Sequence, residues 1–181
     1  MRILIASDIH GSASRAAMFR EKIDEMKPDQ IILLGDLLYH GPRNPLPDVY
    51  SPAEVVEILG GLKVPIIAVR GNCDGDVDQF VLPFHLAESA WITDGHYRIL
   101  AIHGHQLPEK DEEIKVPEGT AVLSGHIHIP VAERRGLIHR WNPGSTSLPK
   151  EDYPPSFGLY EDGKFQALDF KGNVLKSDSL K

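Results

Sequence analysis

The chain of 181 residues is 41% hydrophobic and 25% charged, a composition typical of a globular protein with one apolar core. Its formal net charge of −7 argues against a stable complex with nucleic acid, which relies on clustered Lys and Arg. Cys73 is the only cysteine, so an internal disulfide is excluded, and no segment approaches the ~20 apolar residues of a membrane span. We expect a single domain over residues 1–181, in the cytoplasm and away from membranes.

The first half of the chain predicts strands that alternate with helices. Residues 12–27 place apolar side chains at helical spacing, and Pro28 ends the pattern. Residues 51–54 have the sequence of a capping box with proline at the first helical position, which predicts a second helix. Continuous apolar runs predict strands at residues 2–6, 31–34 and 66–69. Such strands are buried on both faces, so we expect a parallel sheet with right-handed crossovers.

The second half predicts a run of β-hairpins, with tight turns such as Asp94-Gly95 and Asp162-Gly163. Strand candidates span residues 90–93, 98–102, 121–124, 130–134, 137–141, 157–161, 164–170 and 173–176. We expect them to form a second, largely antiparallel or mixed sheet that packs face to face on the first, with helices outside. Two longer loops, residues 36–51 and 104–119, have a length that is often functional.

Polar side chains that can bind metal follow most of the predicted core strands. These residues are Asp8, His10, Asp36, Asn72, His103, His105, His126 and His128. In open α/β sheets, ligands bind in the crevice outside the carboxyl ends of the strands. Five separate segments are therefore expected to direct polar groups toward one place.

Each of these residues taken alone has a simpler explanation. An Asp after a strand is usually a turn or cap residue, and a lone His near a strand end is usually a surface residue. Together they are informative, because all five segments follow apolar strands and four contain a glycine, which allows close approach of the backbone. Asp8-x-His10 and His126-x-His128 also place two side chains on one side of an extended segment.

The ligand types predict a site for two metal ions. Carboxylate, imidazole and amide oxygen without a required thiolate suit manganese, iron, zinc, cobalt or nickel. Without His105, these residues supply seven ligands. Seven are too many for one tetrahedral zinc and enough for two ions of higher coordination. Two ions about 3.5–4 Å apart form a clamp for in-line displacement at phosphorus.

The motifs resemble those of the calcineurin-like metallophosphoesterases. The ordered set runs from residue 8 to residue 128 and comprises Asp8-Ile9-His10, Gly35-Asp36, Gly71-Asn72-Cys73-Asp74, His103-Gly104-His105 and Gly125-His126-Ile127-His128. The resemblance implies a four-layer α/β/β/α sandwich of two mixed sheets. It also implies a phosphoric ester hydrolase that cleaves small phosphodiesters with a metal-bridging hydroxide.

The resemblance further implies a role for each ligand. One ion is expected on Asp8, His10 and His128, and the other on Asn72, His103 and His126, with Asp36 as the bridge. Manganese is the first choice for both ions, with nickel, cobalt, zinc, iron or magnesium as alternatives. Asn72 is also expected to stabilise charge that develops on the phosphoryl oxygens. A homo-oligomer is compatible with the resemblance.

Cys73 departs from the family pattern, in which many members carry a His that acts as the general acid. A thiol has an ordinary pKa near ~8.5 and is a poor match to that role at neutral pH. His105, His40 or water could replace it, and Cys73 could equally be a small buried side chain beneath the site. We therefore expect a preference for diesters with good leaving groups, such as aryl or nucleotide esters.

Arg43, Arg70 and His40 are candidates for substrate binding, although either arginine could instead be a structural ion-pair partner. Three other functions remain open. A phosphomonoesterase would use the same site with a different pocket shape, and a non-catalytic interaction scaffold is known in this fold. A nuclease on polymeric substrates is disfavoured by the negative net charge.

Overall fold

The computed structural model describes residues 1–108 and 110–181, so Glu109 in the expected loop 104–119 lies outside the described residues. The helices are α1 (Ala13–Met26), α2 (Pro52–Gly60), α3 (Asp78–Val81) and the 3-10 helix η1 (Asp111–Glu113). The strands are β1 (Arg2–Ala6), β2 (Gln30–Leu33), β3 (Ile66–Val69), β4 (Leu86–Ala87), β5 (Ser89–Asp94), β6 (Tyr97–Ile102), β7 (Ala121–Leu123), β8 (Pro130–Arg135), β9 (Ile138–Pro143), β10 (Ser156–Glu161), β11 (Lys164–Asp169) and β12 (Val174–Ser179).

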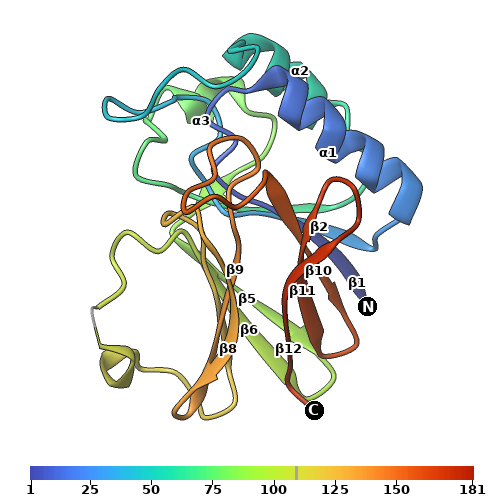
Figure 1. The fold of residues 1–181 in the computed structure, drawn as a ribbon. Coiled ribbons are helices and arrows are strands. Elements are labelled where there is room, and N and C mark those ends of the chain that lie inside the picture. The colour runs from blue at the N-terminus through green and yellow to red at the C-terminus, as the bar shows by residue number, and fades with distance from the viewer. Residues whose placement is uncertain (109) are drawn as a thin grey trace.

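Seven strands form the first sheet, in the order β12-β11-β10-β1-β2-β3-β4. Strands β1 to β4 are mutually parallel, as the apolar runs predict. The expectation that all the later hairpins build a separate sheet is wrong, because β10 pairs antiparallel with β1 and carries β11 and β12 with it. Figure 1 shows β10 to β12 beside the N-terminal strands.

Five strands form the second sheet, in the order β5-β6-β7-β9-β8. Strands β6, β7 and β9 are parallel, whereas β5 and β8 pair antiparallel at the two edges. The predicted sandwich of two mixed sheets is therefore confirmed. Both sheets direct the carboxyl ends of their parallel strands toward the same region, which positions the site described below.

Two apolar clusters explain why the central strands are apolar on both faces. Leu4 and Ala6 of β1 pack toward the helices in one cluster, whereas Ile3 and Ile5 point into the second cluster, between the sheets. There Trp141 of β9 stacks on the ring of Phe165 of β11, at a centroid distance of 5.0 Å. Side chains alternate across a strand, so each face of β1 needs its own apolar partner.

Helices α1 and α2 cover one side of the sandwich (Figure 1). Ser12 caps α1 by accepting the amide of Arg15 at 3.4 Å. The predicted capping box of α2 is wrong in detail, because the side chain of its N-cap Ser51 makes no cap hydrogen bond with the described residues. Over the five-stranded sheet the described chain supplies only η1, where Asp111 pairs with Arg140 of β9.

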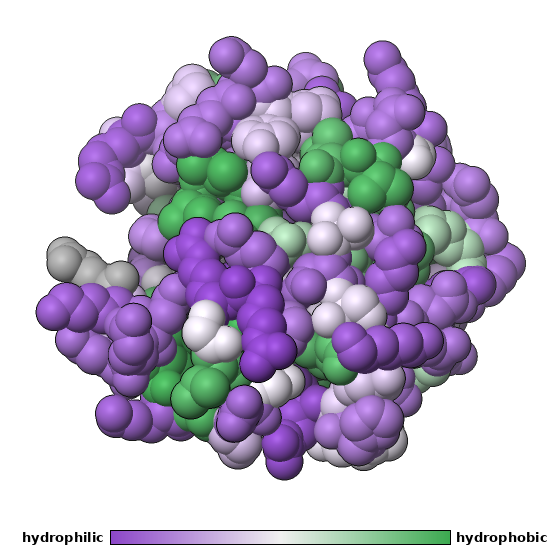
Figure 2. Space-filling model, turned by 60° about the horizontal axis from the view of Figure 1, so that its bottom comes forward, coloured by the Kyte–Doolittle hydropathy of each residue, from purple (hydrophilic) through white to green (hydrophobic). Residues whose placement is uncertain are grey.

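The surface drawn in Figure 2 is mostly hydrophilic, and its hydrophobic side chains form separate patches. Among the described residues, no helix combines the length and the apolar character needed to cross a membrane.

Candidate metal centre

Strained backbone conformations mark the predicted ligands. Positive φ angles of 49° to 68° occur at Asp8, His10, Asp36, His126 and His128. Residues with a Cβ rarely adopt this region, and such residues cluster at active and ligand-binding sites. Five of the seven predicted ligands therefore carry a conformational cost that the surrounding structure must offset.

Glycines next to these ligands allow the strand ends to approach one another. A Cβ at Gly125 would overlap the hydroxyl of Ser7 and lie 2.8 Å from Oδ2 of Asp8. A Cβ at Gly71 would overlap the carboxylate of Asp36. The glycines that the sequence places beside the ligands are thus required by close packing between turns from different strands.

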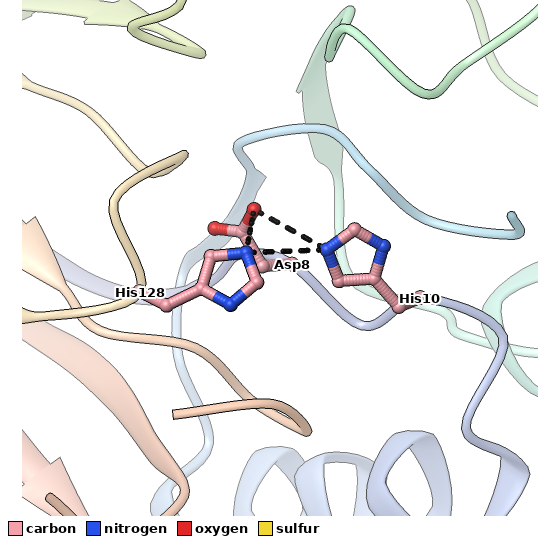
Figure 3. Close-up of side chains that lie close together, drawn as sticks. All are labelled: Asp8, His10 and His128. Carbon is pink, nitrogen blue, oxygen red and sulfur yellow. Dashed lines mark hydrogen bonds and ion pairs between the residues drawn. The ribbon is translucent and has the colours of Figure 1, made fainter. Parts of the chain in front are cut away.

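The first cluster joins Asp8 and His10, which follow β1, with His128, which follows β7 (Figure 3). The Nε2 atoms of His10 and His128 lie 3.2 Å apart. Oδ1 of Asp8 lies 3.2 Å from Nε2 of His128 and 3.7 Å from Nε2 of His10. This oxygen is buried and has no hydrogen-bond partner among the described residues. A cation between the three atoms would satisfy all of them.

Backbone carbonyls orient the imidazoles of this cluster. Nδ1 of His10 donates to the carbonyl of Tyr39 at 2.8 Å, and Nδ1 of His128 donates to that of Leu148 at 2.5 Å. A carbonyl can only accept, so in the neutral rings the proton sits on Nδ1 and Nε2 carries the lone pair. This is the usual arrangement of metal-binding histidines.

The second cluster contains His103 after β6 and Asn72 after β3. Nε2 of His103 lies 3.0 Å from Oδ1 of Asn72 and 3.4 Å from Oδ2 of Asp36, while its Nδ1 bonds the carbonyl of Leu34 at 2.6 Å. Burial lowers the pKa of His103, but the carboxylates of Asp36 and Asp8 outweigh burial and raise this pKa to about 9. A positive charge is therefore favoured at this point.

Asp36 lies between the two clusters. Its Oδ2 atom is 3.8 Å from Nε2 of His10 and 3.4 Å from Nε2 of His103, while Oδ1 accepts the amide of Cys73 at 2.7 Å. Burial raises the pKa of Asp36, but the hydrogen bond and charge of His103 outweigh it, so the net direction is down. A charged carboxylate that faces both clusters can bridge two cations.

His126 lies beside the second cluster. Its ring centroid is 5.2 Å from that of His103, and its backbone amide donates to Oδ2 of Asp8 at 3.0 Å. Burial and the charge of His103 lower the pKa of His126, which favours the neutral ring that a metal requires.

Cys73 is half-buried at the same place. Its sulfur accepts the side-chain amide of Asn72 at 3.3 Å and lies within 4.8 Å of ligand atoms of His10 and Asp36. Burial and the charge of Asp36 raise the pKa of the thiol to about 12. The thiol is therefore neutral at ordinary pH in the metal-free protein.

The remaining predicted residues lie at different distances from the centre. Arg43 lines a cavity of about 370 Å³ above the clusters, and the exposed ring of His105 is 5.5 Å from that of His103. His40 packs between the rings of Tyr39 and Tyr50, at 4.9 and 5.4 Å. Arg70 pairs with the carboxylate of Asp76 and lines a separate cavity.

Sequence reasoning missed two contributors. Lys150 and Tyr39 line the cavity above the clusters, but each is an ordinary loop residue with no local pattern to single it out. Asp74 belongs to the Gly71-Asn72-Cys73-Asp74 motif, in which the sequence assigned it no metal-binding role. It is buried and accepts the amides of Asp36 and Gly71 at 2.8 and 2.7 Å, so it ties together the two turns that carry the predicted ligands Asp36 and Asn72.

The protein combines two mixed sheets with buried carboxylates and imidazoles at the strand ends, which is the architecture of a metal-dependent phosphoesterase. The model of the calcineurin-like phosphoesterase superfamily domain matches residues 1–162, and the chain belongs to this superfamily. The predictions of this family and of a hydrolase that acts on phosphoric esters are confirmed.

The chain is similar to Phosphodiesterase YfcE of Escherichia coli strain K12, with 40% identity over 164 residues that cover 89% of this chain and 88% of that protein. The solved structure of Yfce, a phosphoesterase from E. coli, superimposes with a TM-score of 0.95 at 36% identity and full coverage of both chains. A Vps29 mutant from Entamoeba histolytica shares the fold, with a TM-score of 0.63 at 23% identity over 92% of this chain and 89% of that one.

Proposed function

We propose that this protein is a metal-dependent phosphodiesterase that acts on small phosphodiesters in the cytoplasm, with residues 1–181 as one domain. The position of Asp36 carries the proposal, because one oxygen of this carboxylate faces His10 at 3.8 Å and His103 at 3.4 Å. The similarity to Phosphodiesterase YfcE supports the choice of diesters. A stable complex with nucleic acid or a membrane is not part of the proposal.

The ligand atoms fit two divalent ions, with manganese as our first choice. One ion would bind Asp8, His10 and His128, and the unpartnered oxygen of Asp8 supports this assignment. The other would bind Asn72, His103 and His126, with Asp36 shared. When bound, the ions supply positive charge for the phosphoryl oxygens and lower the pKa of a water that attacks phosphorus.

The chain itself positions the substrate and the leaving group. Arg43 and Lys150 line the cavity and are its cationic side chains among the described residues, so they attract the phosphate. Cys73 stands where many family members carry a His, and a thiol is a weaker general acid than an imidazole at neutral pH. Exposed His105, near His103 and His126, is the alternative donor to the leaving group.

The test compares bis(p-nitrophenyl) phosphate with p-nitrophenyl phosphate. The protein is stripped with a chelator and supplied in turn with manganese, nickel, cobalt, zinc, iron or magnesium. Asp36→Asn and His126→Ala should each lower diester hydrolysis by at least about 10²-fold, as expected when a metal ligand is lost. His96→Ala, which removes an exposed imidazole from the β5–β6 turn, serves as the matched control.

Three results would contradict the proposal. A higher kcat/KM on the monoester than on the diester would identify a phosphomonoesterase. Absence of turnover with every metal, despite two bound ions per chain, would favour an interaction scaffold, the role left open by the fold. Full activity in Asp36→Asn would show that the shared carboxylate is not needed.

A further inference from the structure

Exposed apolar side chains concentrate next to the metal centre. The described chain has eleven exposed large hydrophobic residues, and seven of them fall in residues 39–50 and 77–81. Val77 is 67% exposed and Phe80 is 88% exposed. Tyr39, Tyr50, Val77 and Val81 of this set line one groove. Contiguous exposed apolar surface of this kind usually marks a binding site.

The two segments and helix α2 line a groove of about 550 Å³. Tyr39 and Tyr50 come from the first segment, Ala53 and Val56 from α2, and Val77 and Val81 from the last segment. The charged side chains among its described lining residues, Glu57 and Asp78, are both acidic. A phosphate would be repelled there, whereas an uncharged apolar group would be accepted.

The groove adjoins the cavity above the metal centre at Tyr39. Tyr39 lines both spaces, and its carbonyl holds Nδ1 of His10 at 2.8 Å. Tyr50, which also lines the groove, packs on the segment after His10. Its backbone forms a β-bridge with Ser12, and a Cβ at Gly11 would overlap the ring of Tyr50. Tyr39 follows Asp36 in the chain, and Val77 and Val81 follow Asn72. These parts of the groove lining therefore extend segments that carry predicted metal ligands.

We propose that this groove is a subsite for an apolar ester group, so that the enzyme prefers phosphodiesters in which one ester group is an extended alkyl or aryl chain. The inference rests on the proposed function, because the phosphate must lie above the metal ions, close to Arg43 and Lys150. From that position an ester group that extends past Tyr39 would enter the groove. The two spaces favour different parts of the substrate. The cationic side chains of Arg43 and Lys150 favour the phosphate in the cavity, whereas the apolar and acidic side chains of the groove favour an uncharged ester group.

The test measures binding of alkylphosphonates to the manganese-loaded protein by calorimetry. An alkylphosphonate is not hydrolysed and carries a single alkyl group. Its affinity therefore reports binding of that group in the groove, independently of which ester group of a diester leaves during hydrolysis. Burial of one CH₂ group contributes up to about fourfold in affinity. Partial burial of several groups should therefore make octylphosphonate bind at least ~10-fold more tightly than methylphosphonate, with all concentrations kept below micelle formation.

The double variant Val77→Ser/Val81→Ser should lose at least about five-fold of the octyl advantage and bind methylphosphonate as before. Val174→Ser on β12 is the matched control, because Val174 is 52% exposed and lies outside the groove. Hydrolysis of methyl p-nitrophenyl phosphate, measured in parallel, tests the proposed function separately. Alkyl-length dependence without turnover would support the groove while refuting the phosphodiesterase.

Turnover of the methyl ester with equal affinity for methylphosphonate and octylphosphonate would overturn the inference and leave the phosphodiesterase standing. Sedimentation velocity adds a second criterion. If the wild type is a dimer that the double variant dissociates, and octylphosphonate has no advantage, a second copy of the chain covers the groove and the inference is wrong.

Discussion

The buried carboxylate of Asp74 accepts the backbone amide of Asp36 at 2.8 Å. The same carboxylate accepts the amides of Leu37 at 2.8 Å and Gly71 at 2.7 Å, so it joins the turn after β2 to the turn after β3. Asp36 and Asn72, one predicted ligand from each turn, are thereby held at a constant separation. We therefore treat Asp74 as a positioning residue for the metal centre.

Replacement Asp74→Asn should weaken manganese binding by about 10- to 100-fold, because partners behind metal ligands have effects of this size. It should also lower the free energy of unfolding by about 1–3 kcal/mol, since the amide group of Asn directs an N–H at a backbone N–H. Calorimetric titration with manganese and urea denaturation measure the two effects. The control is Asp76→Asn, which removes an exposed carboxylate two residues away. Equal effects in both variants would contradict the positioning role.

Metal binding should stabilise the fold through His128. Free manganese at 100 times its dissociation constant should raise the free energy of unfolding by about 2.7 kcal/mol. For a chain of this size that corresponds to an increase in Tm of about 5–10 °C. A chelator should reverse the increase, and His128→Ala should lose more than half of it, because the ring of His128 closes the cluster with Asp8 and His10.

His96→Ala is the matched control for this measurement, because it removes an exposed imidazole far from the cluster in the chain. Its Tm should respond to manganese as the wild type does. An unchanged response in His128→Ala would show that this imidazole does not hold the metal.

The thiol of Cys73 should lose its proton only at high pH in the metal-free protein. Its pKa is raised to about 12, so the thiolate fraction should increase tenfold per pH unit between pH 7 and pH 10 without a plateau. The rate of alkylation by iodoacetamide in the presence of a chelator, followed by mass spectrometry, reports that fraction. Protein unfolded in urea is the control and should level off near pH ~8.5–9. A plateau near pH 8.5 in the folded protein would refute the raised pKa.

A second prediction on pH concerns Asp178 of β12, which accepts Nδ1 of His139 at 2.6 Å and Nε1 of Trp141 at 2.8 Å. Burial raises the pKa of Asp178, but these two hydrogen bonds outweigh burial and the net shift is downward. The stabilisation is therefore complete above the unfolded pKa of ~3.9 and is lost as the pH falls through the lower folded value.

Asp178→Asn should accordingly lower the free energy of unfolding by about 1–3 kcal/mol at pH 7, and the difference from the wild type should shrink below pH ~4. Urea denaturation at several pH values measures it. Asp24→Asn on the exposed face of α1 is the control, with an expected change within about 0.5 kcal/mol. A difference that stays constant to pH 3 would show that the charge of Asp178 contributes nothing.

Much of the candidate centre could be predicted because its signal is local. Asp8, Asp36 and Asn72 each follow an apolar strand, and parallel strands bring their carboxyl ends to one edge. The need for glycine next to Asp36 and Asn72 could be predicted for the same reason, because these glycines are neighbours of the ligands in the sequence. By contrast, the contributions of Lys150 and Asp74 depend on which loops lie above or behind the clusters, and no pattern within those loops reveals that.

Every strand except the two-residue β4 could be located from the sequence, together with the polar groups at the strand ends, because apolar runs and ligand–glycine pairs depend on neighbours within a few residues. The partner of each strand, by contrast, depends on tertiary packing. An apolar pattern records that a face is buried but not against what, so β10 could pair with β1 or extend the second sheet. The same limit applies to Arg70, which the fold directs toward Asp76, and to the groove beside Tyr39, which exists only where two distant segments meet.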